Sequence, residues 1–164
     1  MLPSLPRAAA LAVALSTPAL GSLLLPSSAA AQALANTQQL AMPDGVTLAT
    51  DVWAPLLGGG PRPVLLRRTP YGRAVDFNTA NALVNAGYVL VSQDVRGRGD
   101  SKGTFVPFFD DAVDGKATIE WAAKQPWSNG KVGLNGISYY AIMQWLVASH
   151  QPPHLTAMCA WEGA

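Results

Sequence analysis

The chain has 164 residues, a formal net charge of +1 and charged residues at 13% of its positions. Such a nearly neutral chain lacks the basic surface that binds nucleic acid or an anionic membrane, so we expect neither partner. Its single cysteine excludes an internal disulfide and a cysteine-rich metal cluster.

Residues 1–31 have the pattern of a targeting segment. Arg7 is followed by an apolar run over residues 8–25 and by small residues over 27–31. This order is typical of a signal peptide, so we predict that 1–31 is cleaved and that the protein is secreted or periplasmic, with no membrane attachment afterwards. The alternative is a retained transmembrane anchor, which the prolines and the glycine within the run disfavour.

The rest of the chain begins with a polar stretch, 32–38, which we predict to be a short tether to one domain over 39–164. Asp44-Gly45 predicts a tight turn between two strands, because glycine adopts the positive φ that the turn requires. After the turn, apolar and threonine side chains alternate with a period of two, as in a strand with one buried face.

Strands and helices then alternate. We expect strands at 64–66, 88–92, 132–135 and 155–161, and helices at 76–86, from 110 until Pro126, and at 138–149. This alternation predicts an α/β fold: a mostly parallel sheet with an N-terminal antiparallel hairpin and helices on both faces.

Helical periodicity predicts the buried faces of the first two helices. They are Phe77, Ala80 and Val84 on the first helix, and Val113, Ala117 and Trp121 on the second. Cys159 lies in the apolar last strand, and we predict that it is a small core residue.

The segment Gly136-Ile137-Ser138-Tyr139-Tyr140 connects the third of these parallel strands to a helix. A sharp strand-to-helix turn raises a serine Oγ above the carboxyl edge of a sheet, and the next backbone N–H can hold a developing oxyanion. We therefore predict that Ser138 is a nucleophile and that the Tyr139 N–H lies in its oxyanion hole. The alternative is a serine that only caps an ordinary helix.

Four motifs occur in a fixed order: RTPYGR (68–73), QDVRGRGDSKG (93–103), QPWSNGKVG (125–133) and GISY (136–139). Together they resemble the cocaine esterase / X-prolyl dipeptidyl-peptidase-like (CocE/NonD) α/β-hydrolases, a family that includes α-amino acid ester hydrolases and glutaryl acylases. The resemblance runs from about Gln38 to the end of the chain. It implies that 39–164 is the N-terminal part of an α/β-hydrolase catalytic domain. It also implies a serine hydrolase that forms an acyl-enzyme from a small ester, an amide or an X-Pro peptide, without a cofactor or metal.

By this resemblance, Tyr71 is the second oxyanion-hole donor, through its phenolic OH. It follows a strand and so lies at the same sheet edge as Ser138; the alternative is a tyrosine half-buried in a turn. The family's G-x-S-Y-x-G motif ends here at Ala141, whose small side chain should preserve close packing.

The loop over 94–103 has two interpretations. Arg96 and Arg98 could pair with Asp94 or Asp100 in a structural loop, with glycines for tight turns. The alternative is that the loop forms a wall of the active site. Arg98-Gly99-Asp100 is also an adhesion tripeptide, but three residues match by chance.

A catalytic serine needs a base and an acid. His150 lies on the same helix as Ser138, about 18 Å further along its axis, and His154 precedes the last strand at the opposite sheet edge. Glu162 follows that strand but has no histidine to orient. We therefore expect the acid and the base in a longer parent protein. The alternative is an inactive truncated remnant or a secreted binding module. Neither the substrate nor the oligomeric state follows from the sequence.

Overall fold

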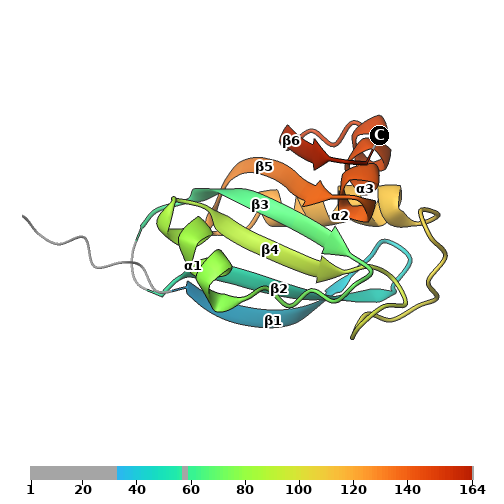
Figure 1. The fold of residues 1–164 in the computed structure, drawn as a ribbon, viewed down its shortest axis with the longest axis horizontal. Helices are drawn as coiled ribbons and strands as arrows, with labels where there is room; N and C mark the ends of the chain where they lie inside the picture. Colours follow the sequence, from blue (N-terminus) through green and yellow to red (C-terminus); the bar gives the residue numbers. More distant parts are fainter. Residues whose placement is uncertain (1–32, 57–58, 164) are drawn as a thin grey trace, which may run out of the picture.

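The computed structural model describes residues 33–56 and 59–163. Within them, six strands form one sheet in the order β1-β2-β4-β3-β5-β6 (Figure 1). The strands are β1 (Ala33–Ala41), β2 (Thr47–Pro55), β3 (Arg62–Thr69), β4 (Val89–Asp94), β5 (Ser128–Ile137) and β6 (Leu155–Trp161). The helices are α1 (Phe77–Asn85), α2 (Asp111–Ala123) and α3 (Tyr139–Ser149).

The sheet confirms the predicted fold class. β1 and β2 form an antiparallel hairpin, and β2 also pairs antiparallel with β4. β4, β3, β5 and β6 are parallel. α1 contacts β1, β2 and β4, whereas α2 and α3 contact β3 and β5, and Figure 1 shows them on opposite faces of the sheet. The parallel strands therefore all end at one edge.

The main core lies between the sheet and the pair α2 and α3. Every second residue of β3 points into it, as Val64 and Leu66 do, each 1% exposed. The other fully buried members include Val89, Val91, Ile119, Ala122 and Val132. Burial of each large aliphatic side chain stabilises the fold by about 1.5–3 kcal/mol.

The predicted tether is wrong for residues 33–38, because they belong to β1 and pair with β2 along its length. Thr37 also donates a hydrogen bond to Asp51 across the hairpin, at 2.7 Å. The polar composition is misleading here because an edge strand is held by backbone pairing and can keep solvated side chains.

The predicted buried face of α2 is confirmed only in part. Trp121 packs half-buried against the core, but Val113 is 49% exposed, and Asp111, Asp114, Gly115 and Thr118 are buried. The helix is rotated relative to the apolar pattern because its two aspartates pair with Arg68 of β3 and with Arg96, which follows β4. On α1, Ala80 and Val84 are buried as predicted, but Phe77 is 49% exposed.

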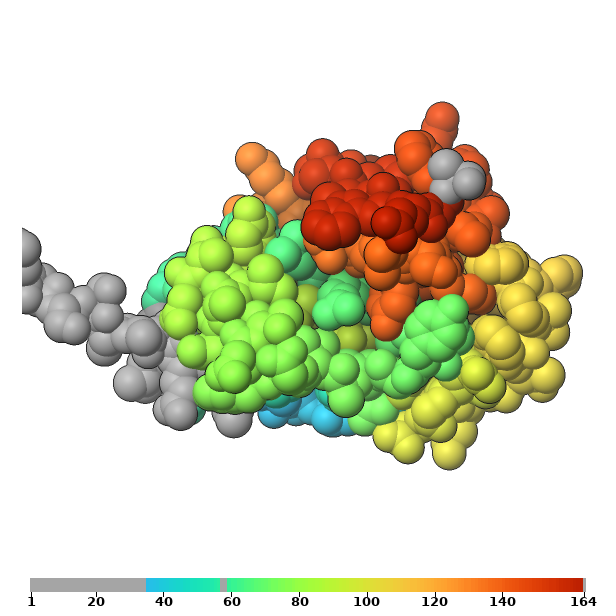
Figure 2. Space-filling view, in the orientation of Figure 1, coloured from blue at the N-terminus to red at the C-terminus, as the bar shows by residue number. Residues whose placement is uncertain are grey.

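β6 has the predicted bounds, but Cys159 is exposed rather than part of the core. α3 covers one face of β6, whereas α1 lies over β1, β2 and β4 and does not reach the other face. Figure 2 shows a hollow between the lime-coloured α1 and the red β6, and Arg67, Ile137 and Trp161 line a pocket on this side of the sheet.

The predicted signal peptide, 1–31, lies outside the described residues. None of the helices in the described part of the chain is long and apolar enough to cross a membrane.

Candidate active site

The turn between β5 and α3 has a strained backbone at Ser138. This residue has φ 58° and ψ −122°, a region that residues other than glycine seldom occupy and that costs about 1–3 kcal/mol. Its side chain makes no capping hydrogen bond to α3, so the hydroxyl is not used as an ordinary N-cap. Ser138 is exposed. The turn thus has the geometry of a nucleophile elbow.

Backbone hydrogen bonds fix the elbow on both sides. The Ser138 N–H donates to the Trp161 carbonyl of β6 at 3.0 Å, and the Ser138 carbonyl accepts from Ala141 and Ile142 at 2.9 and 3.0 Å. A Cβ at Gly136 would lie 2.2 Å from the Tyr140 Cβ, so only glycine fits before the turn.

Ala141 replaces the last glycine of the family motif without opening the packing. It is fully buried, and a Cβ built on Gly163 would lie 2.3 Å from the Ala141 Cβ. The chain after β6 therefore passes directly against the first turn of α3, because both contact positions carry small residues.

The Tyr139 N–H is at the N-terminus of α3, where backbone N–H groups have no acceptor within the helix and the helix dipole favours negative charge. The Tyr139 phenol is buried and donates a hydrogen bond to Asp111 Oδ2 at 2.7 Å. Burial and this bond to the carboxylate raise the pKa of the phenol above its usual value, so it remains a neutral donor. The side chain thus anchors the residue that directly follows Ser138.

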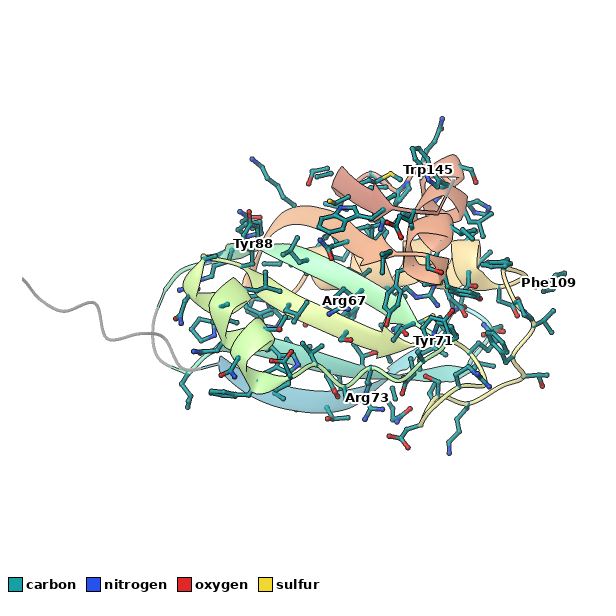
Figure 3. The ribbon with its side chains drawn as sticks, viewed as in Figure 1. Arg67, Tyr71, Arg73, Tyr88, Phe109 and Trp145 are labelled. Carbon is teal, nitrogen blue, oxygen red and sulfur yellow. The ribbon has the colours of Figure 1, made fainter. Side chains whose placement is uncertain are left out.

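Tyr71 lies at the same edge, after β3, and is 66% exposed, so it is not the half-buried turn residue of the alternative interpretation. Its ring centroid is 5.9 Å from that of Tyr140 and 6.2 Å from that of Tyr139. Figure 3 shows it beyond the end of β3, beside the start of α3. The structure thus brings Tyr71 and the two residues after Ser138 together.

A buried polar network under the elbow was missed by the sequence interpretation. Arg68, only 4% exposed, donates to the Gln93 amide oxygen at 2.7 Å and to the Asp111 carbonyl at 2.8 Å, and lies 3.4 Å from the Asp111 carboxylate. Burial lowers the pKa of Arg68, and the charges of Asp111 and Asp114 oppose this. One feature of the sequence could have revealed this network. Arg68 lies on the same face of β3 as Val64 and Leu66, which points into the core.

The pairing predicted within the 94–103 loop is wrong. Asp94 and Asp100 both pair with Arg73, at 2.7 and 2.8 Å, and Arg73 also reaches Asp51. Arg96 pairs instead with Asp44, Asp110 and Asp114. These partners come from distant segments of the chain, which is why spacing within the loop did not reveal them.

The same loop turns back on itself at Gly97, which has φ 67° and where a Cβ would lie 2.2 Å from the Phe105 nitrogen. Arg98 donates to the Pro70 carbonyl at 3.1 Å and lies over the Phe105 ring. The loop is therefore a fixed structural element that also lines a pocket beside Tyr71.

Neither histidine is near the elbow. His150 follows α3 at its C-terminal end, and its carbonyl accepts a hydrogen bond from Lys116. His154 pairs with Glu120 at 2.8 Å, and its carbonyl accepts from Val132 near the start of β5. Glu162, just after β6, is exposed. The described residues thus provide an elbow and candidate oxyanion donors, but no histidine base beside them.

Comparison with known proteins agrees with this geometry. The family profile described as X-Pro dipeptidyl-peptidase (S15 family) matches residues 44–164. The chain belongs to this family. It is 41% identical over 121 residues to the cocaine esterase of Rhodococcus sp. (strain MB1 Bresler), an alignment that covers 70% of this chain and 21% of the esterase.

Solved structures give the same result. A CocE/NonD family hydrolase from Staphylococcus aureus superposes with a TM-score of 0.68 and 34% identity, covering 74% of this chain and 26% of that one. An α-amino acid ester hydrolase superposes with a TM-score of 0.69 and 27% identity, covering 87% and 28%. The S15-family chain is thus a member of a hydrolase and esterase family and spans 21–28% of the length of these relatives.

Proposed function

We propose that this chain supplies the nucleophile and the oxyanion hole of a serine hydrolase that acts on small esters, amides or X-Pro peptides. The observation that carries the proposal is the strained backbone of Ser138, together with a hydroxyl that no helix N–H engages. Strain of this kind persists only where the surrounding structure fixes it, and it is concentrated at functional sites.

In the proposed reaction, Ser138 Oγ attacks the substrate carbonyl carbon and loses its proton to a base. The Tyr139 N–H and the Tyr71 OH donate hydrogen bonds to the resulting oxyanion. The tetrahedral intermediate collapses to an acyl-enzyme and releases the alcohol or amine, and water then releases the acid. The base and its orienting acid come from outside the described residues, since neither histidine of the chain reaches the elbow.

The proposal includes the location of the protein. The pattern of residues 1–31 supports export through a cleaved signal peptide, with a chain that begins near residue 32 and requires no cofactor.

A fluorophosphonate probe tests the proposed nucleophile. The test uses residues 32–164 and the longest protein that the reading frame encodes, here called the full-length protein. We expect labelling of the full-length protein that is abolished by Ser138→Ala and kept by Ser149→Ala, a control at the far end of α3.

Absence of labelling in a full-length protein that is shown to be folded would refute the serine hydrolase. A secreted binding module or an inactive remnant would then be the better description, and the positions of both histidines favour that second candidate for the chain by itself.

A further inference from the structure

The buried side chain of Gln144 links α3 to the two strands next to the elbow. α3 contacts both β5 and β6 (Figure 1), and Gln144 is only 3% exposed. Its Nε2 donates to the Cys159 carbonyl of β6 at 3.1 Å and, more weakly, to the Gly136 carbonyl of β5 at 3.5 Å. These two carbonyls fix the orientation of the amide, because the reversed amide would place Oε1 against two other oxygens.

This link closes a ring of contacts around Ser138. The Ser138 N–H donates to the Trp161 carbonyl at 3.0 Å, and Trp161 lies two residues along β6 from the carbonyl that Gln144 binds. α3 begins directly after Ser138 and contains Gln144. β6 is therefore attached to the elbow at one point and to α3 at a second. A strained backbone persists only where its surroundings restrict relaxation, and the second attachment adds such a restriction.

The oxygen of the same amide and one nitrogen of Arg68 have no hydrogen-bond partner. In the described part of the chain, Gln144 Oε1 and Arg68 Nη2 are both buried and form no hydrogen bond. The other nitrogens of Arg68 are paired, Nε with Gln93 and Nη1 with Asp111. Nη2 is 3.8 Å from Asp114 Oδ2, which is beyond hydrogen-bond distance. Buried polar atoms that lack a hydrogen bond destabilise a fold, so a partner for both atoms is expected.

Arg68 and Gln144 line the same small cavity between α3 and the strands β3 and β5. Its volume of about 10 Å³ is enough for one water molecule. The rest of its lining is Leu134, Tyr140, Met143 and Val147. A molecule that pairs with both unpaired atoms must donate to Gln144 Oε1 and accept from Arg68 Nη2. Water does both, whereas the amide oxygen repels an anion and the guanidinium repels a cation.

We propose that Gln144 is a positioning residue for the elbow: its Nε2 holds β6, and its Oε1 accepts from one buried water that in turn accepts from Arg68 Nη2. The water extends the network of Asp111 and Arg68 to α3. The conformation of Ser138 then depends on a side chain that lies beneath the site. The inference rests on the proposed function, because it accounts for how the nucleophile is held.

A crystal structure of the full-length protein tests the water site directly. We expect one water within about 3.2 Å of both Gln144 Oε1 and Arg68 Nη2, and its loss in Gln144→Met. An anion at this position, a direct bond between the two side chains, or no density at a resolution that shows other buried waters would each overturn the proposal.

The kinetics of Gln144→Met test the positioning role, since methionine preserves most of the volume and removes both polar ends. With a neutral p-nitrophenyl ester we expect kcat to fall about 10-fold, the effect of about one lost hydrogen bond, and KM to stay within about 2-fold. Hydrogen exchange of the Ser138 N–H, followed by mass spectrometry, should become faster. Val84→Ala is the control, because it removes buried packing on α1, across the sheet from α3, and should change neither kcat nor this exchange.

A kcat and an exchange rate in Gln144→Met equal to those of Val84→Ala would show a purely structural residue and overturn the proposal. Hydrogen exchange needs no catalysis, so it separates the two hypotheses. Faster exchange of the Ser138 N–H in Gln144→Met, in a protein that hydrolyses no ester and is not labelled by a fluorophosphonate, would refute the serine hydrolase and retain the link.

Discussion

Ser138 and Tyr71 illustrate how much of the candidate site depends on single residues. The serine is identifiable because the glycine before it and the tyrosine after it form a recognisable motif. Its conformation is not visible in the motif: φ 58° results from hydrogen bonds to β6 and within α3, so it exists only when those elements are assembled. Tyr71, in contrast, was assigned by resemblance, and the structure places its ring beside Tyr139 and Tyr140.

Tyr71→Phe in the full-length protein removes one proposed oxyanion donor and keeps the ring. Loss of such a donor costs about 10²- to 10³-fold in kcat. We expect that decrease with little change in the melting temperature, because Tyr71 is 66% exposed. Steady-state kinetics with a neutral p-nitrophenyl ester measure it; an unchanged kcat would remove Tyr71 from the oxyanion hole.

Asp111 is a buried residue whose importance the sequence did not reveal. Asp111→Asn leaves the buried Arg68 guanidinium without its nearest carboxylate and weakens the bond to the Tyr139 OH. Removal of one partner of a buried ion pair costs about 3–5 kcal/mol. We therefore expect Asp111→Asn to lower the free energy of unfolding by that order. Urea denaturation of the full-length protein measures it.

Asp110→Asn is the matched control, since its side chain is 36% exposed and lies 3.6 Å from Arg96. A long, partly solvated pair of this kind contributes about 1 kcal/mol or less. Similar losses in the two variants would contradict the role of Asp111 as the carboxylate that links Arg68 to the elbow.

Among the secondary-structure elements, the junction of β5 and α3 is the one whose geometry the proposed function requires. Gly136→Ala would place a Cβ 2.2 Å from the Tyr140 Cβ, so the turn must shift. We expect a destabilisation of about 1–3 kcal/mol, as for other overpacked sites, and loss of fluorophosphonate labelling.

Gly133→Ala, on the same strand, is the control. Its Cβ would meet Leu65 at 3.5 Å, an ordinary contact. Labelling should persist in that variant, and retention of labelling in Gly136→Ala would show that the elbow tolerates a side chain there.

The elements also show where patterns fail. The last strand follows directly from its apolar run, and α1 begins at Phe77, within one residue of the predicted start. The buried face of α2 follows only in part, because two of its inward positions carry aspartates that pair with Arg68 and Arg96. An apolar periodicity cannot identify a face that is held by ion pairs.

For the molecule as a whole, the proposed export predicts where the chain begins. N-terminal sequencing of the protein recovered from the culture medium or the periplasm should start near residue 32. A protein that keeps Met1 and remains with the membrane fraction would support the anchor instead. The cut should leave β1, which starts at Ala33, intact at the edge of the sheet.

The sequence by itself determined the α/β class, the strand and helix order and the position of the elbow, because these depend on local periodicity and on one glycine-serine turn. Only the tertiary structure decided that 33–38 form an edge strand, that Cys159 is exposed and that Arg73 rather than Arg96 holds Asp94. Edge pairing, coverage of a sheet face and the choice among several carboxylates all depend on which distant segments meet, and spacing along the chain does not contain that information.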